Sequence, residues 1–410
     1  MFSATIALQL AVTLASCGGG EGDGLVTVVD SSGVAIVSNG AERDHLEVWK
    51  LTEEPEASIG QLAGDDPAHL FSEVRGAVRL SDGRLVVGDW GSKEARYFDA
   101  RGNHVLTVGG AGEGPGELRL LYRLDRIVGD TVVVGGWPIG SRYWFDEKGG
   151  FIRAEALGPW FPGLLGRTLP DGALILDTYE YGSYGNTLET WAQRGPDNDL
   201  RPQGVLELVS RDGSTTDSIG EFRGQTWHKV GEIGQTFAMH ALPFSPTGMV
   251  AWSRDLVFVG HGERAEVRAF RRDGELVRIM RWDPAPVAVR AADRTTFSES
   301  VLGSANRPGR LAALRRWLSE IEFPAVMPAF VAMISADDGW LWVRDSSSIE
   351  DDLARWTVYR PDGTAGAVAD LPAAYEVLAV DSTHIVARSS DDFGVEYVWA
   401  HRIIRGSGRD

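Results

Sequence analysis

Short apolar runs separated by tight-turn signals recur along most of the chain, and residues 76–108 show the pattern most fully. Four runs rich in Val, Leu, Tyr and Phe are joined there by three turns. Runs of this length, bounded by Gly and Asp, predict β-strands. The first turn is at Asp82-Gly83 and the third at Arg101-Gly102, where glycine allows the positive φ that a tight hairpin requires. The segment is therefore predicted to form one four-stranded antiparallel unit.

The spacing of nineteen residues between these two turns returns, within a few residues, further along the chain. Self-similarity at such a period indicates a repeat fold in which each unit is one small sheet. One unit is stretched by an insertion around residues 180–203. The other turn pairs that carry the repeat are Gly129-Asp130 with Lys148-Gly149, Asp171-Gly172 with Asp212-Gly213, Arg254-Asp255 with Asp273-Gly274, and Asp338-Gly339 with Asp362-Gly363.

A further unit begins at Val377 and lacks its last strand, while Leu46–Leu51 and Ala57–Ile59 resemble the closing strands of a blade. Pairing of these N-terminal strands with the last unit would remove the exposed edges that an open sheet leaves. We therefore expect an all-β fold: a six-bladed β-propeller of four-stranded antiparallel blades, closed by N- and C-terminal strands into one domain over residues 25–405. Seven blades are the alternative, because the stretched unit could divide into two.

One blade carries a more specific pattern. An apolar strand that ends in an acidic residue, Leu85–Asp89, is followed by Tyr97–Gly102 and by the glycine-rich stretch Gly109–Glu117. In this order, residues 76–117 resemble the NHL repeat of β-propeller proteins, and the glycine-rich stretch resembles the linker between NHL blades. The resemblance implies a binding platform, since most NHL-type propellers are platforms. A minority of related six-bladed propellers are lactonases, lyases or esterases with a central cation.

A long connection between two blades, residues 283–327, contains the helical signals of the sequence. Asp293 is placed to cap one helix. On a second helix, Leu311, Leu314 and Leu318 recur at helical spacing. We expect a short helical insertion at about residues 290–322, either as a lid or docking element over one face of the propeller or as a packed decoration.

The N-terminal residues 1–16 are uncharged, mostly apolar and too short for a membrane-spanning helix. They lead into Leu14-Ala15-Ser16-Cys17, which resembles the bacterial lipobox, although the usual basic start of a signal peptide is missing. Cys17 is the one cysteine of the chain, so it has no disulfide partner and stands where lipidation needs a thiol. We expect a signal peptide over residues 1–16, lipidation at Cys17 and a flexible tether at residues 17–24. The resemblance implies a lipid-anchored protein of the cell envelope, and Gly18 implies the outer membrane, facing the periplasm.

The charge balance argues against one class of partner. The chain has 58 acidic and 40 basic residues, a net charge of −18, whereas phosphate backbones are bound mainly through Lys and Arg. Nucleic acid is therefore not an expected partner. Hydrophobic residues make up 43% of the chain, which suits a folded globular domain. We expect a monomer that meets the membrane through its anchor and binds a protein or a small molecule.

Candidate binding residues follow from the geometry of a propeller. Loops from the second to the third strand emerge on the same face as the connections between blades, so their side chains gather on one rim. Aromatic faces there can stack on a ligand, and carboxylates can accept hydrogen bonds or attract positive charge. The alternative for each is a structural role, because Asp in turns often serves its own backbone and Trp packs between sheets. The ligand-face candidates are Asp89, Trp90, Trp137, Asp177, Tyr179, Tyr181, His261 and Asp345.

Sequence motifs for catalysis, cofactors and metals are missing. The eight histidines are scattered without ligand spacing, and no Gly-x-Ser-x-Gly motif occurs. The glycine-rich residues 109–117 contain no Lys for a phosphate, and Ser346–Asp352 lacks the alternating oxygen ligands of a calcium loop. The sequence therefore predicts no catalytic residue, no cofactor and no metal.

We interpret the chain, on its sequence, as a membrane-anchored, non-catalytic β-propeller that binds a protein or small ligand on its loop face. Two alternatives stand beside this interpretation. One is a cation-dependent hydrolase or lyase of the six-bladed type, which holds a central divalent cation with carboxylates from several blades. The other is a structural component of an envelope complex, which needs no pocket.

Overall fold

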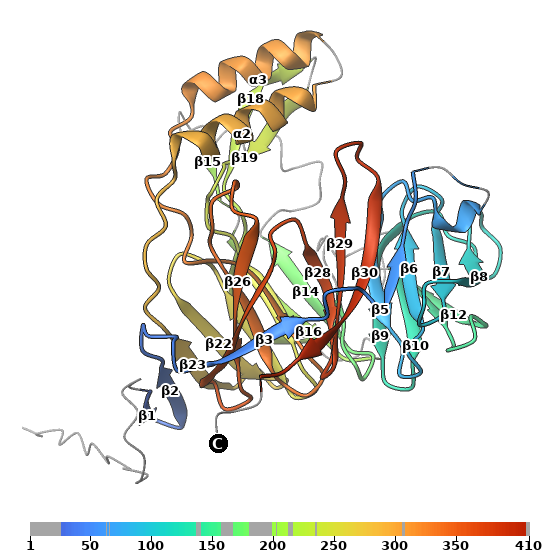
Figure 1. Cartoon of the computed structure of the whole chain (residues 1–410), viewed down its shortest axis with the longest axis horizontal. Coiled ribbons are helices and arrows are strands. Elements are labelled where there is room, and N and C mark those ends of the chain that lie inside the picture. Colours follow the sequence, from blue (N-terminus) through green and yellow to red (C-terminus); the bar gives the residue numbers. More distant parts are fainter. Residues whose placement is uncertain are drawn as a thin grey trace, which may run out of the picture.

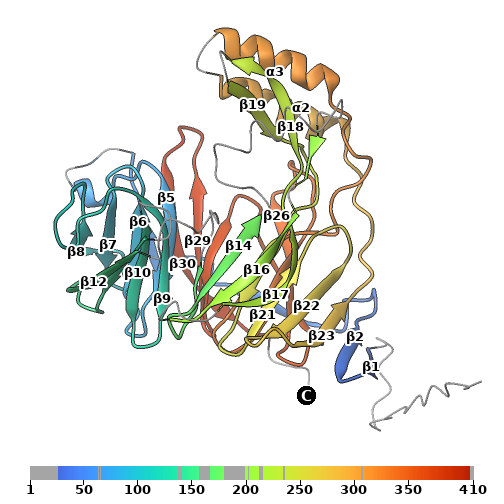
Figure 2. The same cartoon turned by 180° about the vertical axis from the view of Figure 1, so that it is seen from behind.

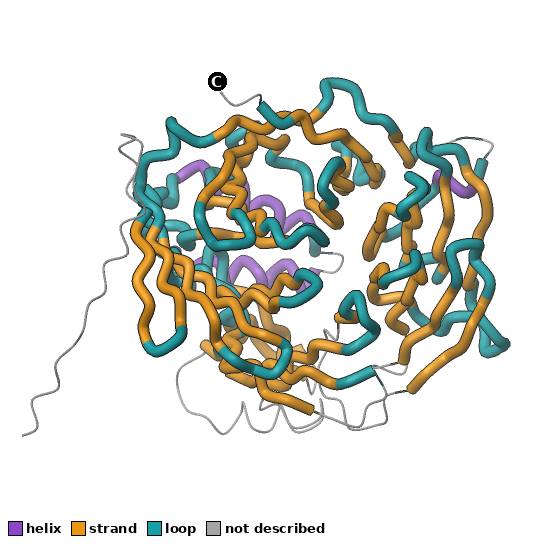
Figure 3. The backbone as a smooth tube through the Cα atoms, turned by 90° about the horizontal axis from the view of Figure 1, so that it is seen from below, coloured by secondary structure: helices purple, strands orange, loops and turns teal. Residues whose placement is uncertain are grey.

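The computed structural model describes residues 26–62, 64, 66–136, 141–156, 167–179, 199–201, 203–211, 216–233, 236–305 and 308–406. Its sheets stand side by side around a central opening, which Figure 3 shows from below. The chain is all-β in character, with many four-stranded sheets, as the sequence predicts.

Three four-stranded antiparallel sheets come first along the chain. In each of them the strands are hydrogen-bonded in chain order, so each sheet is a meander built on tight turns. The sheets consist of β5 (Val74–Arg79), β6 (Leu85–Asp89), β7 (Glu94–Phe98) and β8 (His104–Gly109); of β9 (Leu121–Ile127), β10 (Thr131–Gly136), β11 (Ser141–Phe145) and β12 (Phe151–Ala156); and of β13 (Arg167–Thr168), β14 (Leu174–Tyr179), β16 (Gln203–Val209) and β17 (Thr216–Arg223).

The C-terminal half of the ring repeats this arrangement, again with strands paired in chain order. Its strands are β20 (Met249–Trp252), β21 (Leu256–Gly260), β22 (Glu266–Arg271) and β23 (Leu276–Arg281); β24 (Phe330–Ser335), β25 (Leu341–Asp345), β26 (Leu353–Tyr359) and β27 (Ala365–Pro372); and β28 (Glu376–Val380), β29 (His384–Ser390) and β30 (Glu396–Ile404).

N-terminal strands complete this half of the ring (Figure 1). The hairpin of β1 (Thr27–Ser31) and β2 (Val34–Ser38) joins the sheet of β20–β23 through parallel pairing of β2 with β23. Strand β3 (Glu47–Leu51) pairs with both β27 and β30 and so connects two sheets. Strand β4 (Ala57–Ile59) pairs antiparallel with β30 and gives β28–β30 a fourth strand. Segments from the two ends of the chain are thereby held in one sheet.

The repeated turns have the backbone geometry that their sequences predict. Gly83 and Gly102 have φ of +92° and +87°, a region that favours glycine. In the stretched unit, β14 pairs directly with β16, so the unit forms one sheet. Residues 180–198 of the insertion lie outside the described residues.

A small module stands on one face of the ring, which we call the upper face (Figures 1 and 2). It contains a sheet of β15 (Asp199–Leu200), β18 (Trp227–Ile233) and β19 (Thr236–Ala241), and the helices α2 (Ala291–Gly303) and α3 (Pro308–Glu320). Val301, Leu314 and Trp317 form its own apolar core. Within the described ranges, no helix combines the length and the apolar character that crossing a membrane requires.

The core lies between neighbouring sheets. Val86, Tyr97 and Leu124 belong to one such cluster, and Trp342 and Ile385 to another. Each large apolar side chain buried in this way contributes roughly 1.5–3 kcal/mol. All five residues of β6 are buried, because β6 lies between β5 and β7 in its sheet and both faces of that sheet are covered by neighbouring sheets. This explains why the sequence shows continuous apolar runs in place of strict alternation.

Candidate functional site

An axial cavity of about 510 Å³ runs through the middle of the ring and is lined by β5, β9, β13, β20, β24 and β28. At its lower end, opposite the module, Nη2 of Arg126 lies 2.5 Å from Oδ2 of Asp337. Because β9 and β24 stand on opposite sides of the ring, this ion pair crosses the lower mouth of the cavity. Arg79 and Asp381 form a second ion pair there, at 3.1 Å.

Replacing Asp337 by Asn is expected to change stability little. The Asp337 side chain is 64% exposed and that of Arg126 is 25% exposed, and ion pairs near the surface contribute only about 0–1 kcal/mol. We expect a loss below about 1 kcal/mol in urea unfolding, and no loss at high salt, where the charges are screened. A loss of about 3 kcal/mol or more, typical of a buried pair, would contradict this.

Asp89 ends β6 and is only 1% exposed. Its carboxylate accepts the backbone N–H groups of Ser72 at 3.0 Å, Glu73 at 2.8 Å and Ser92 at 3.0 Å. The guanidinium of Arg96 lies 3.8 Å away. Burial acts to raise the pKa of Asp89, but the N–H groups outweigh it and the pKa is lowered. This carboxylate therefore fixes two loops and is not free to meet a ligand.

Two other candidates are more accessible. Trp90 is 37% exposed, and the guanidinium of Arg75, which lines the axial cavity, lies 5.9 Å from the centre of its ring. Asp345 ends β25, and its Oδ2 lies 3.4 Å from Oγ1 of Thr357. Burial raises the pKa of Asp345 to about 6. Asp345 is thus a carboxyl group that titrates close to neutral pH.

The described candidates do not form one cluster. Asp89, His261 and Asp345 belong to three different sheets, and only His261 lines the pocket described below. Asp177 and Tyr179 lie in β14, opposite Leu206 and Gly204 of β16. The other two candidates lie outside the described residues; they are Trp137 and Tyr181.

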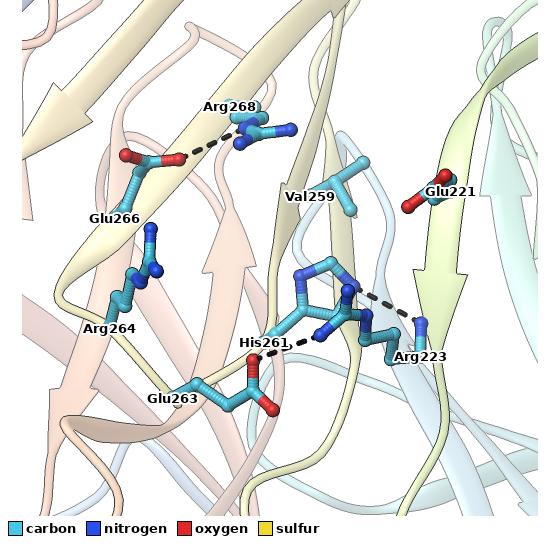
Figure 4. Close-up of a pocket in the computed structure, with 8 residues that line it drawn as sticks. All are labelled: Glu221, Arg223, Val259, His261, Glu263, Arg264, Glu266 and Arg268. Carbon is cyan, nitrogen blue, oxygen red and sulfur yellow. Dashed lines mark hydrogen bonds and ion pairs between the residues drawn. The ribbon is translucent and has the colours of Figure 1, made fainter. Parts of the chain in front are cut away.

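A candidate site with both charged and histidine side chains is a pocket of about 230 Å³ between β17 and the strands β21 and β22, which we call the His261 pocket (Figure 4). Its residues come from two neighbouring sheets, so only the packing of the ring brings them together. The lining residues are Glu221, Arg223, Val259, His261, Glu263, Arg264, Glu266 and Arg268.

Glycines on both sides position His261. A Cβ at Gly260 would lie 2.6 Å from the ring of Phe330, and a Cβ at Gly262 would lie 2.8 Å from the Phe330 carbonyl oxygen. Gly262 also has a φ of +66°, and its carbonyl accepts the N–H of Ala329 at 2.8 Å. The loop therefore packs directly against the start of β24, which leaves room only for glycine beside His261.

The two ring nitrogens of His261 have different surroundings. Nε2 accepts the backbone N–H of Arg223 at 3.1 Å, which assigns the proton of the neutral ring to Nδ1. Burial lowers the pKa of His261, and nearby arginines lower it further against the opposing effect of Glu263. The ring is therefore neutral at pH 7. Figure 4 shows its second nitrogen turned away from Arg223, toward the side of the pocket where Arg264 lies.

Ion pairs hold most charged groups of the His261 pocket. Glu263 pairs with Arg201 and lies 3.5 Å from Arg223. Glu266 pairs with Arg268 at 2.9 Å. The pocket thus offers a ligand the Nδ1–H of His261, the guanidinium of Arg264 and the carboxylate of Glu221. Among the Glu and Arg side chains of the pocket, the two that form no ion pair within the described ranges are Arg264 and Glu221.

Sequence reasoning identified His261 but missed its neighbours. Glu221 and Arg223 end the outermost strand of the preceding sheet, far from His261 in the sequence, and no turn signal points to them. The available signal was the alternation of charge at Arg264, Glu266 and Arg268, which places these side chains at every second position before and along β22.

The described residues do not fit a central divalent cation. No group of three or more His, Cys, Asp and Glu side chains in the described part of the chain is placed to hold a metal ion. At the lower mouth of the axial cavity, Asp337 and Asp381 are paired with arginines. In the His261 pocket, Glu263 and Glu266 are paired in the same way.

No protein-family model matches the chain, and no curated protein matches its sequence. Solved structures resemble it, and they are β-propeller-like. A putative exported protein from Bacteroides fragilis is 12% identical with a TM-score of 0.46, over 89% of this chain and 99% of that one. The PQQ-bound aldose sugar dehydrogenase from Streptomyces coelicolor is 14% identical with a TM-score of 0.42, over 88% and 100%. Virginiamycin B lyase from Staphylococcus aureus is 9% identical with a TM-score of 0.39, over 87% and 99%.

These comparisons correct the functional interpretation of the sequence. The neighbours include a lyase, a sugar dehydrogenase and a luciferin-regenerating enzyme. They do not support the prediction of a non-catalytic platform, and its hydrolase-or-lyase alternative agrees better with them. At such low identity the neighbours bear on the fold and not on a substrate. The chain is an all-β protein whose solved structural neighbours are β-propeller-like.

Proposed function

We propose that this chain is a lyase, whose His261 pocket binds an acidic small molecule and removes a proton from the carbon next to its carboxylate. The observation that carries the proposal is the neutral His261 ring, which is held by the N–H of Arg223 and whose Nδ1–H has no hydrogen-bond partner among the described residues and can serve a ligand. Removing such a proton requires a base, a cation for the carboxylate and a donor for the negative charge that develops on oxygen. Glu221, Arg264 and His261 are suited to these three tasks.

In the proposed reaction, Arg264 binds the substrate carboxylate and Glu221 takes the proton from its α-carbon. The electron pair of the broken C–H bond forms a C=C bond as a hydroxyl or alkoxyl group leaves the neighbouring carbon and takes a proton from water. Nδ1–H of His261 donates to the carboxylate oxygen on which charge accumulates. His261 is not the base, because the lone pair of Nε2 already accepts a backbone N–H.

Covalent hydrolysis is less well supported by the same pocket. None of the eight described residues that line it is Ser, Thr or Cys, so this part of the pocket offers no hydroxyl or thiol nucleophile.

The test is to screen acidic sugars and hydroxy acids as substrates. The α,β-unsaturated carboxylate that elimination would form is detected by its ultraviolet absorbance. Arg264→Gln is expected to raise KM about tenfold or more, because a charged hydrogen bond to substrate is lost. His261→Phe is expected to lower kcat by about 10²–10³, the usual cost of losing an oxyanion donor. Arg254→Gln, at an exposed residue in the β20–β21 turn of the same sheet, is the matched control. Unchanged KM in Arg264→Gln would contradict the assignment.

We also propose that Cys17 carries the lipid anchor, that the protein is a monomer on the outer membrane facing the periplasm, and that residues 25–405 form one domain of six blades. The anchor rests on residues 14–17. The blade count is supported by the six innermost strands that line the axial cavity. Labelled palmitate is expected in the wild-type protein and not in Cys17→Ala; label in the variant would contradict the anchor.

A further inference from the structure

A second cavity, of about 540 Å³, lies beneath the module on the upper face. We call it the Arg344 cavity. It lies near the His261 pocket: Met327, Pro328 and Phe330 line it, and the N–H of Ala329, between them in the chain, donates to the carbonyl oxygen of Gly262, next to His261. Most of its lining is apolar: Phe244, Met327, Pro328, Phe330, Val331, Ile349, Ala373 and Ala374.

Among the described residues that line this cavity, Arg344 is the one charged residue. Its Nη2 donates to the carbonyl oxygen of Ala373 at 3.1 Å, but its Nε is buried without a hydrogen-bond partner. No ion pair of Arg344 occurs within the described ranges, and burial lowers its pKa. A guanidinium that is largely out of water without an anion costs free energy, so the cavity is incomplete without a negative charge.

Hydroxyl groups lie next to Arg344. The Ser346 hydroxyl donates to the Pro328 carbonyl, and the Ser348 hydroxyl donates to Asp293 at the start of α2. These bonds tie the β25–β26 connection to the module and so fix the wall of the cavity. The hydroxyl group of Ser347, between them, forms no bond within the described ranges and can serve a ligand.

We propose that the Arg344 cavity binds a small amphipathic molecule that has one carboxylate. The carboxylate pairs with Arg344, and the apolar body packs against Phe244 and Phe330. The described lining has one cation, no acidic residue and a mainly apolar wall, which together match a ligand with a single negative charge on an apolar body. The volume lies in the range of ordinary ligand pockets. The site is separate from the proposed reaction, whose substrate is held by Arg264.

The probes are phenylbutyrate and its uncharged counterpart phenylbutanol, titrated calorimetrically into the full-length protein. The wild type is expected to bind the acid about tenfold more tightly than the alcohol. Arg344→Met should bind both equally. Arg360→Met, at an exposed arginine of the same sheet, should keep the preference. Arg264→Gln should keep it too, because the His261 pocket is not involved.

Thermal melting gives a second measurement. Phenylbutyrate is expected to raise the Tm of the wild type and not that of Arg344→Met. The Tm of the variant itself should not fall, because the substitution removes a half-buried charge that has no ion pair within the described ranges. If Arg344→Met fails to fold, Ser347→Trp, which fills the cavity, should abolish binding of both compounds. Equal affinity of the wild type for acid and alcohol, a preference that survives Arg344→Met, or a preference lost in Arg264→Gln would overturn the proposal.

Discussion

Replacing Asp89 by Ala is expected to lower the free energy of unfolding by about 3–5 kcal/mol. The carboxylate is 1% exposed and accepts three backbone N–H groups, so its loss leaves three partly buried donors without this acceptor. The substitution also removes the carboxylate that lies 3.8 Å from the guanidinium of Arg96, whose side chain is 7% exposed. Urea unfolding measures the change. Asp82→Ala, at a half-exposed turn carboxylate of the same sheet, is the control and should cost about 1 kcal/mol or less.

The pH dependence of Asp89 follows from the lowered pKa of its carboxyl group. A carboxyl group whose pKa is lower in the folded state stabilises the protein above its unfolded pKa, about 3.9, and this stability is lost as the pH falls through the folded value. The gap in stability between wild type and Asp89→Ala should therefore shrink only below about pH 4. A gap that stays constant to lower pH would contradict the contribution of the ionised carboxylate.

Replacing Asp345 by Asn is expected to raise the free energy of unfolding at pH 7.5 by roughly 2–3 kcal/mol. The pKa of Asp345 is raised by burial from 3.8 to about 6, so at pH 7.5 the folded protein holds an ionised carboxylate whose burial costs free energy. For such a group, stability falls as the pH rises from the unfolded value through the folded value. The amide is uncharged and can still bond Thr357, so the variant does not have this loss.

The measurement for Asp345 is urea unfolding at two pH values. At pH 4 the wild-type carboxyl group is largely protonated in the folded state, so wild type and Asp345→Asn should be about equally stable. Above pH 6 the variant should be the more stable of the two. A variant that is less stable than wild type at pH 7.5 would show that an ionised Asp345 has a partner that stabilises it.

The sequence predicts much of the fold because turns and strands are local. Each of two hairpins is signalled by one glycine that can adopt a positive φ, in Asp82-Gly83 and in Arg101-Gly102. Both glycines have the predicted positive φ. Central strands such as β6 are recognisable as apolar runs because both of their faces are covered. The hairpin β18–β19 was missed, since its sequence contains Lys229, Glu232 and His228 among its apolar residues and lacks a continuous run.

The candidate site could be predicted only in part, because it depends on contacts between sheets. His261 was identified from its place in a loop, whereas Glu221 comes from another sheet and meets it only after packing. The sequence could not show whether the Asp89 carboxylate binds a ligand or backbone N–H groups. It binds the N–H groups of Ser72 and Glu73, which belong to a different loop. A turn acid that binds its own backbone and one that faces a ligand have the same local sequence.

The central claim is that Glu221 removes a proton from a carboxylate-bearing substrate held in the His261 pocket. Deuterium incorporation at the α-carbon of that substrate, followed by NMR in D₂O, tests it most directly, because it reports proton removal whether or not elimination follows. The wild type is expected to incorporate deuterium, Glu221→Gln to do so at least about 10²-fold more slowly, and Glu275→Gln, at an exposed glutamate outside the pocket, at the wild-type rate. Unchanged incorporation by Glu221→Gln would contradict the account.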